Sequence, residues 1–265
     1  MRHTETIAAL CLVALVALAG CSAISGPGNG SGNTTTNAAD KPYQTPLNGT
    51  QIDRQHASIL RDAGSFTYQT HTTANYANGT ASQSVTIKSD LDSGAHLLRV
   101  AQGPQDSQVY EGPNGTAYTR LAVGNRTSYI NGSLRRVDPT ALVSPGVANA
   151  TERANFTYNG TTTADGTTLY TYVGHPSTLN LANASALGNV SSAANITVQL
   201  GITADGLVQQ RRYHIDTSRT SLDATISYAA VGSTDPTPAW LNEARQRFAN
   251  QSASNETATT TTSNA

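Results

Sequence analysis

The stretch Ile196-Thr-Val-Gln-Leu-Gly-Ile-Thr-Ala-Asp-Gly-Leu-Val208 decides the fold of this chain. Every second residue in its first half is apolar, which is the period of a strand with one buried face, and Asp-Gly then forms a hairpin turn. The chain returns over 207–215, with Tyr213 and Ile215 on the inner face, and a third alternating run follows over 222–230. These three runs predict an antiparallel meander with one face in solvent.

Shorter alternating runs bounded by turn residues fill the preceding part of the chain. Asn78-Gly79 and Asn114-Gly115 are predicted hairpin turns, and a later hairpin turns either at Asn159-Gly160 or at Asp165-Gly166. The runs predict further antiparallel strands around residues 66–68, 85–87, 98–100, 109, 117–121, 156–158 and 169–173. We therefore expect one curled, mostly antiparallel sheet.

A helix is predicted near each end of this strand-rich region. Thr50 is placed as the N-cap of the first helix, which spans 50–63 with an apolar stripe and ends at Gly64. The second helix covers 240–248, and a short helix is predicted to begin at Asp138-Pro139. Together with the strands, these helices predict the α+β fold class.

Composition divides the chain into four parts. Residues 21–47 are rich in Gly, Ser, Asn and Thr and are predicted to form a flexible tether. Residues 48–248 form a single β-rich domain, within which 177–194 has no clean period and is expected to be loop with some helix. From residue 249 the Ser/Thr-rich composition predicts a disordered tail over 249–265.

Residues 1–20 have the pattern of an export signal. Arg2 precedes an apolar run over 7–17 that is too short to span a bilayer, and small residues follow it. The exit, Leu18-Ala-Gly-Cys21, resembles the lipobox of secreted lipoproteins. That resemblance implies cleavage before Cys21 and a lipid on its sulfur. We therefore expect an exported protein anchored to the outer face of the cell membrane through Cys21.

Charge and cysteine content exclude several classes of protein. The formal net charge is −1, which is not the footprint of a nucleic-acid-binding protein. The two cysteines are Cys11, lost with the signal, and the anchor Cys21, so the mature chain has no disulfide and no cysteine-based metal site. We expect a monomer without a cofactor.

Glycosylation sequons are enriched in the chain. The 20 asparagines and the 62 serines and threonines among 265 residues would give about five Asn-X-Ser/Thr triplets by chance, and the sequence contains 15. Asn-Gly-Thr is also good turn chemistry, so both explanations hold for different sites. The best candidates for N-glycans lie at predicted turns, where a transferase can reach them. They are Asn78, Asn114, Asn131 and Asn159.

No arrangement of titratable residues in the sequence predicts an enzyme or a metal centre. His56 lies on the apolar helix stripe and is interpreted as a core histidine rather than a ligand. His214 and Asp216 share a strand face, as an acid–base pair requires, but a solvated face near a turn is favoured. Two interpretations are open for each of the pairs Arg135-Arg136 and Arg211-Arg212. One arginine of the pair binds a carboxylate or a lipid headgroup, or both lie on a solvated face. The solvated face is again the favoured interpretation.

The helix, the meander, Ile202-Thr-Ala-Asp-Gly-Leu-Val208 and Pro238-Ala-Trp240 together carry a family resemblance over roughly 50–245. The chain resembles the uncharacterised surface lipoproteins of halophilic archaea, which are in turn similar in fold to the LolA/LppX-type lipoprotein carriers. The resemblance implies an incomplete β-barrel curled around one or two helices on its concave face, with acyl chains as ligands.

An apolar sheet face that two helices cannot cover must either close on itself or hold something. We therefore expect a non-enzymatic protein that binds an apolar ligand such as a lipid or isoprenoid. The alternative is a structural or adhesive envelope protein without a small-molecule ligand. The predicted cavity is lined by Ile52, Ile59, Leu60, Val198, Leu200, Ile226 and Tyr228.

Overall fold

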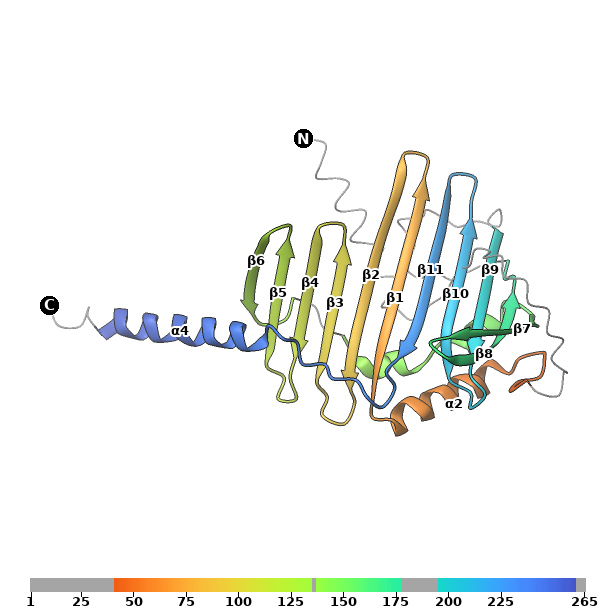
Figure 1. Cartoon of the computed structure of the whole chain (residues 1–265), viewed down its shortest axis with the longest axis horizontal. Helices are drawn as coiled ribbons and strands as arrows, with labels where there is room; N and C mark the ends of the chain where they lie inside the picture. Colours follow the sequence, from red (N-terminus) through yellow and green to blue (C-terminus); the bar gives the residue numbers. More distant parts are fainter. Residues whose placement is uncertain (1–40, 135–136, 178–194, 261–265) are drawn as a thin grey trace.

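The computed structural model describes residues 41–134, 137–177 and 195–260, of which 252–260 are described as backbone only. In this part of the chain, eleven strands form one open, curled antiparallel sheet, so the predicted α+β fold class is confirmed (Figure 1). The strands are β1 (Ser65–Tyr76), β2 (Gly79–Asp90), β3 (His96–Gln102), β4 (Gln105–Glu111), β5 (Ala117–Val123), β6 (Arg126–Asn131), β7 (Phe156–Ala164), β8 (Thr167–Gly174), β9 (Asn195–Ile202), β10 (Val208–Asp216) and β11 (Thr220–Ala229).

Two meanders meet at the centre of the sheet. The strand order is β6-β5-β4-β3-β2-β1-β11-β10-β9-β8-β7, so the first meander runs outward from β1 and the second runs inward to β11. The central seam between β1 and β11 places Tyr68 directly opposite Tyr228. The sheet does not close within the described residues, where β6 and β7 are its two edges.

The turns lie at the predicted positions or within one residue of them. Ala77-Asn78 joins β1 to β2, one residue before the predicted pair, and Gly79, the first residue of β2, adopts a φ of 145° that only glycine tolerates readily. The alternative left open for the β7–β8 hairpin is decided in favour of Asp165-Gly166, where both residues have positive φ. At the other candidate, Asn159-Gly160, the register shifts between Tyr158 and Thr161, so that pair forms a bulge inside β7.

Helix α2 (Gly49–Asp62) covers part of the inner sheet face, which we define as the face that carries Tyr68 and Tyr228. It begins earlier than predicted, because the N-cap is Asn48, whose side chain accepts a hydrogen bond from the backbone N–H of Gln51, rather than Thr50. Both residue types cap helices well. The earlier start places Gly49 against the Ala148 backbone, where a Cβ atom would lie 2.6 Å from the Ala148 Cα.

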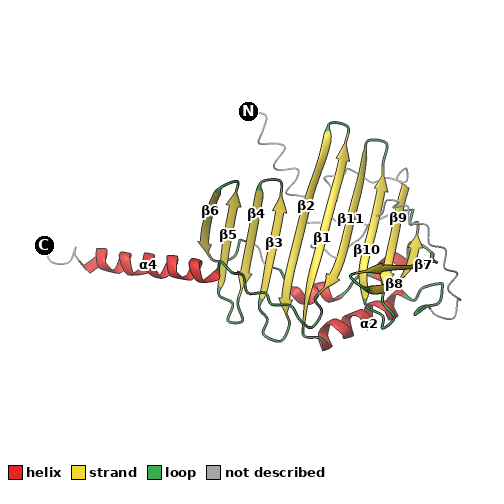
Figure 2. Cartoon of the chain, in the orientation of Figure 1, coloured by secondary structure: helices red, strands yellow, loops and turns green. Residues whose placement is uncertain are grey.

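Two short helices lie between β6 and β7 in the chain and add to the cover of the inner face (Figure 2). The 3-10 helix η1 (Pro139–Val143) is capped by Asp138, as the sequence predicts, and buries Leu142 and Val143. Helix α3 (Val147–Thr151), which was not predicted, follows at once and packs against α2. We call residues 139–151 the cover segment.

Helix α4 (Leu241–Thr260) begins near its predicted position but does not end at 248. The helix therefore extends into 249–260, which the sequence assigned to a disordered tail. No glycine or proline interrupts the sequence from 241 to 260, so nothing in it ends the helix. Figure 1 shows α4 leaving the β6 edge and pointing away from the sheet.

The start of α4 packs on the outer face of the sheet. The Trp240 indole N–H donates to the Gln108 amide oxygen (2.7 Å), and Gln108 faces outward because its neighbour Val109 is buried on the inner face. The Tyr129 hydroxyl donates to Glu243 (2.9 Å). These contacts leave the inner face over β3–β6 uncovered by α4.

The folded domain begins before the predicted boundary at residue 48. Tyr43 and Leu47 are buried, and the Tyr172 hydroxyl both donates to the Tyr43 carbonyl oxygen (2.8 Å) and accepts from the Tyr43 N–H (3.1 Å). The Gly/Ser composition that predicts a tether ends before Lys41. The rest of that tether, the export signal and the ambiguous 178–194 segment lie outside the described residues.

Candidate ligand-binding face

The inner face consists of rows of side chains that cross the sheet, because residues directly opposite each other on antiparallel strands point to the same side. One row, the tyrosine row, runs from β11 to β6 through Tyr228, Tyr68, Ile87, Leu98, Val109, Thr119 and Ile130. The adjacent arginine row runs from β10 to β6 through Arg211, Ile226, Thr70, Val85, Val100, Ser107, Leu121 and Ser128.

Burial differs between the two rows. The tyrosine row stays buried as far as Thr119 on β5, and only Ile130 on β6 is half-buried. The arginine row is buried from Arg211 to Val85, half-buried from Val100 to Leu121, and exposed at Ser128. In the next row Val123 is 53% exposed although it faces inward. The inner face is therefore core along the tyrosine row, whereas over β3–β6 the arginine row and the row beyond it form an open part, where Val100, Leu121 and Val123 are partly exposed.

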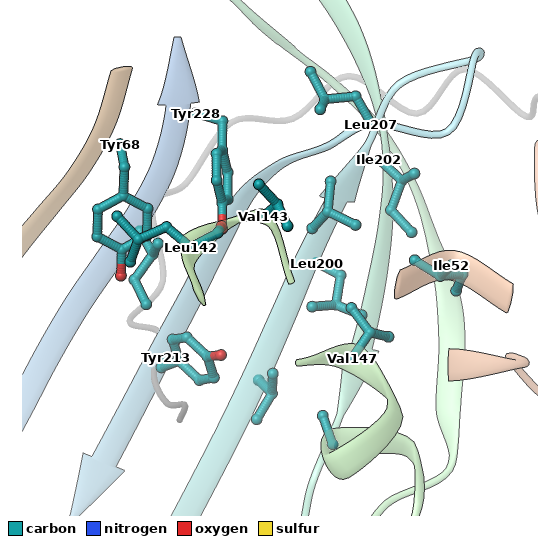
Figure 3. Close-up of a cluster of buried hydrophobic side chains, with 14 of the residues drawn as sticks. Ile52, Tyr68, Leu142, Val143, Val147, Leu200, Ile202, Leu207, Tyr213 and Tyr228 are labelled. Atoms are coloured by element: carbon teal, nitrogen blue, oxygen red, sulfur yellow. The ribbon is translucent and has the colours of Figure 1, made fainter. Parts of the chain in front are cut away.

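The seven residues predicted to line a cavity come together in the structure. Six of them are buried in one hydrophobic cluster, and Ile59 packs against that cluster half-buried. The cluster also contains Leu142, Val143 and Val147 of the cover segment, which Figure 3 draws beside inner-face side chains such as Tyr228 and Leu200. The buried six are Ile52, Leu60, Val198, Leu200, Ile226 and Tyr228.

His56 is a core residue, as predicted. Its Nδ1 accepts a hydrogen bond from the Val208 N–H (3.1 Å), and its ring lies edge-to-face on Tyr228 at 4.5 Å between centroids. Burial lowers the pKa of His56 to about 3, with a further contribution from the positive charge of Arg211. The ring is therefore neutral at physiological pH, and the proton lies on Nε2, which has no hydrogen-bond partner among the described residues.

Arg211 is buried, which corrects the favoured prediction that the Arg211-Arg212 pair is solvated. It is only 2% exposed, whereas Arg212 is exposed on the opposite face of β10. The signal was present in the sequence, because Arg211 has the same strand parity as Tyr213 and Ile215, which were assigned to the inner face. Arg135-Arg136 lies outside the described residues.

Polar groups on α2 and on the sheet hold the cover segment in place. The Asp53 carboxylate on α2 accepts hydrogen bonds from the N–H groups of Val147 (2.8 Å) and Ala148 (3.0 Å) at the start of α3. From the sheet, the Tyr228 hydroxyl donates to the Leu142 carbonyl oxygen (2.7 Å). Arg211 Nη1 donates to the Pro145 carbonyl oxygen and to the Tyr213 hydroxyl (3.1 Å for the latter).

His214 and Asp216, noted in the sequence as a potential acid–base pair, lie on the outer face and not at this site. The His214 ring lies between two carboxylates, with Nε2 2.5 Å from Asp216 and Nδ1 3.0 Å from Asp223. Burial by itself lowers the pKa of His214, but these carboxylates raise it above its ordinary value. Within the described residues, no three His, Cys, Asp or Glu side chains are arranged to hold a metal ion.

All four candidate glycosylation sites are exposed. Asn78 and Asn114 lie in hairpin turns, Asn131 ends β6, and Asn159 lies at the bulge in β7. Every one of them is therefore open to a transferase, although exposure does not decide occupancy.

Comparison with protein families identifies the family. The model of a family of unknown function, DUF7537, matches residues 6–244, which is most of the chain. The chain belongs to the DUF7537 family. A comparison of this DUF7537 chain with curated proteins found no match. None of its described helices combines the length and the apolar character needed to cross a membrane.

Solved structures similar to this DUF7537 chain include lipoprotein LppX from Mycobacterium tuberculosis, at 13% identity, with 72% of this chain and 97% of LppX covered and a TM-score of 0.38. LprF from Mycobacterium bovis matches at 14% identity over 68% of this chain and 91% of LprF, with a TM-score of 0.36. A LolA superfamily protein from Nitrosomonas europaea matches at 10% identity over 73% of this chain and 99% of its own length, with a TM-score of 0.26.

Proposed function

We propose that this protein is an exported, lipid-anchored and glycosylated cell-surface protein that binds an apolar or lipid-like ligand on the inner face of its sheet and catalyses no reaction. One observation carries the ligand proposal. The tyrosine row is buried as far as Thr119 on β5, but next to it over β3–β6 the arginine row and the row beyond it are only partly covered. Over β3–β6 the half-buried Val100, Leu121 and Ile130 and the exposed Val123 form an apolar surface that an acyl chain can cover.

The anchor and the glycans are supported by the sequence alone. Leu18-Ala-Gly-Cys21 supplies the lipidation site, and two acyl or ether chains on Cys21 would be enough for stable anchoring. Exposure of Asn78, Asn114, Asn131 and Asn159 is the condition that N-glycosylation requires.

The ligand proposal is tested by native mass spectrometry of protein purified from its own membrane. We expect an added mass that organic solvent releases as a lipid or isoprenoid. Leu121→Lys, which places a charge on the open inner face, should reduce the bound fraction. Ala122→Lys is the matched control, because it adds the same charge on the same strand but faces outward, opposite Asp106.

Two results would contradict the ligand proposal. One is a wild-type protein that has the bare mass and also fails to bind added apolar probes. The other is equal loss of ligand in both lysine variants, which would show that the inner face is not the binding surface. The first result would favour the structural or adhesive alternative.

A further inference from the structure

Arg211 is a buried cation without an ion pair among the described residues. It is 2% exposed, and no described carboxylate lies within 4.0 Å of its guanidinium. Asp53, which contributes to its electrostatic environment, uses its two carboxylate oxygens to accept from the α3 backbone. An ion that is removed from water without a partner of opposite charge is costly, so its presence requires an explanation.

Hydrogen bonding to the cover segment uses only some of the N–H donors of the Arg211 guanidinium. Nη1 donates to Pro145 and Tyr213, but Nε has no hydrogen-bond partner and is fully buried. A neutral donor would be enough to hold the Pro145 carbonyl oxygen. The guanidinium presents five N–H donors in a fork that fits the two oxygens of a carboxylate or phosphate, and Arg is the preferred residue for such groups.

A second unpartnered polar atom lies on the same row. Ile226 is directly opposite Arg211 on one side and Thr70 on the other, and all three face inward. The Thr70 hydroxyl is buried without a partner, as is Arg211 Nε. Arg211 Nε and the Thr70 hydroxyl are thus two buried donors on one row, two strand-to-strand steps (about 10 Å) apart with Ile226 between them, and neither has an acceptor among the described residues.

The arginine row also runs from this place to the partly exposed part of the inner face. From Val100 on β3 to Arg211 on β10 there are four strand-to-strand steps, or about 19 Å at about 4.8 Å per step. Val100 is half-buried and belongs to the open part of the inner face, whereas Val85 and Ile226 between the two ends are buried and apolar. An elongated apolar chain aligned with this row would have its open end at β3–β5 and its buried end at Arg211.

We propose that Arg211, assisted by the Thr70 hydroxyl, binds the oxyanion head of an amphiphilic ligand, so that the apolar ligand of this protein is a long-chain carboxylate or a lipid with a comparable anionic head. This rests on the proposed function and adds a chemical class and an orientation to it. The head lies over β11, between Arg211 on β10 and Thr70 on β1, and the chain runs toward β3. The neutral phenols of Tyr213 and Tyr228, which line the guanidinium, leave the positive charge available to the ligand.

The test compares an acid with its uncharged ester. The fluorescent fatty acid cis-parinaric acid and its methyl ester are titrated into the delipidated wild-type protein and into two variants. Wild type should bind the acid at least about tenfold more tightly than the ester, which is about 1.4 kcal/mol. Arg211→Met, which keeps the length of the side chain, should bind acid and ester equally. Arg212→Met is the matched control and should keep the preference, because Arg212 points to the outer face.

The outcomes separate the two proposals. If wild type binds both probes equally, or if Arg211→Met keeps the preference for the acid, the oxyanion assignment is wrong while apolar binding stands. If neither probe binds to wild type, the proposed function itself fails. Inorganic phosphate in large excess should leave the acid bound, and displacement by phosphate alone would show a free-anion site instead of an amphiphile head. The wild-type comparison decides the assignment even if Arg211→Met does not fold.

Discussion

Burial of the neutral His56 should make the domain less stable as the pH falls below about 6.5. The pKa of His56 is lowered to about 3 in the folded protein, whereas an unfolded histidine titrates near about 6.5. Between these values the unfolded state binds one more proton than the folded state, so the stabilisation is complete above the unfolded pKa and is lost at about 1.4 kcal/mol per pH unit as the pH falls. At pH 5 the loss amounts to about 2 kcal/mol.

The assay is urea unfolding of wild type and of His56→Asn at pH 7.5 and pH 5. Asn offers an oxygen near the position of Nδ1 to accept from the Val208 N–H, but it does not titrate. The variant should be less stable at pH 7.5, because ring volume is lost from the core, and the gap from wild type should shrink by about 2 kcal/mol at pH 5.

Titration of carboxylates affects both proteins and cancels in the comparison between wild type and His56→Asn. His71→Asn, at an exposed position on β1, is the control and should stay close to wild type at both pH values. A stability gap for His56→Asn that does not change with pH would refute the reasoning, because it would mean that His56 is not held neutral by the fold.

Three further predictions concern the anchor, the glycans and the contact between α2 and α3. Cys21→Ser should move the protein from the membrane fraction to the medium or leave it unprocessed, and a processed variant that stays in the membrane would contradict the lipobox interpretation. Gly49→Ala should lower the free energy of unfolding in a urea titration by about 1–3 kcal/mol, because the added Cβ would meet the Ala148 backbone at 2.6 Å. Gly112→Ala is the control and should change little, because the nearest neighbours of its added Cβ lie at 3.5 Å. Intact-mass measurement of the native protein should show N-glycans, and a mass equal to that of the bare lipidated chain would exclude them. The sites expected to carry them are Asn78, Asn114, Asn131 and Asn159.

Strands and turns were predictable because their signals are local. Alternation over 196–202 and glycines at hairpin turns specify each hairpin without reference to the rest of the chain. The pairing of β1 with β11 was not predictable, because no local pattern in either strand specifies which distant strand it pairs with. The exact start of α2 also depended on tertiary contact, since Gly49 lies close to a helix that the sequence did not indicate.

The candidate site was predictable in its apolar part and was missed in its polar part. Leu200, Ile226 and Tyr228 could be assigned to the inner face from alternation alone. Arg211 follows the same alternation, but its charge made a solvated position the favoured interpretation, because arginine is rarely fully buried. A charged residue that shares the alternation of the apolar residues on its strand is therefore the sequence signal for a buried charge.

The central seam has a consequence for how this chain folds. Tyr68 and Tyr228 face each other across β1 and β11, and they are separated by 160 residues of sequence (228 minus 68). Contacts between such distant residues slow folding, because a large loop must close before they form. During vectorial synthesis the hairpins of β1–β6 can form early, but β1 keeps one free hydrogen-bonding edge until the last strand has emerged. A chain shortened before Thr220 would therefore present that edge permanently, and a free edge of this kind is a template for intermolecular pairing. Pairing of the final strand is thus the step that separates a folded domain from an aggregating chain.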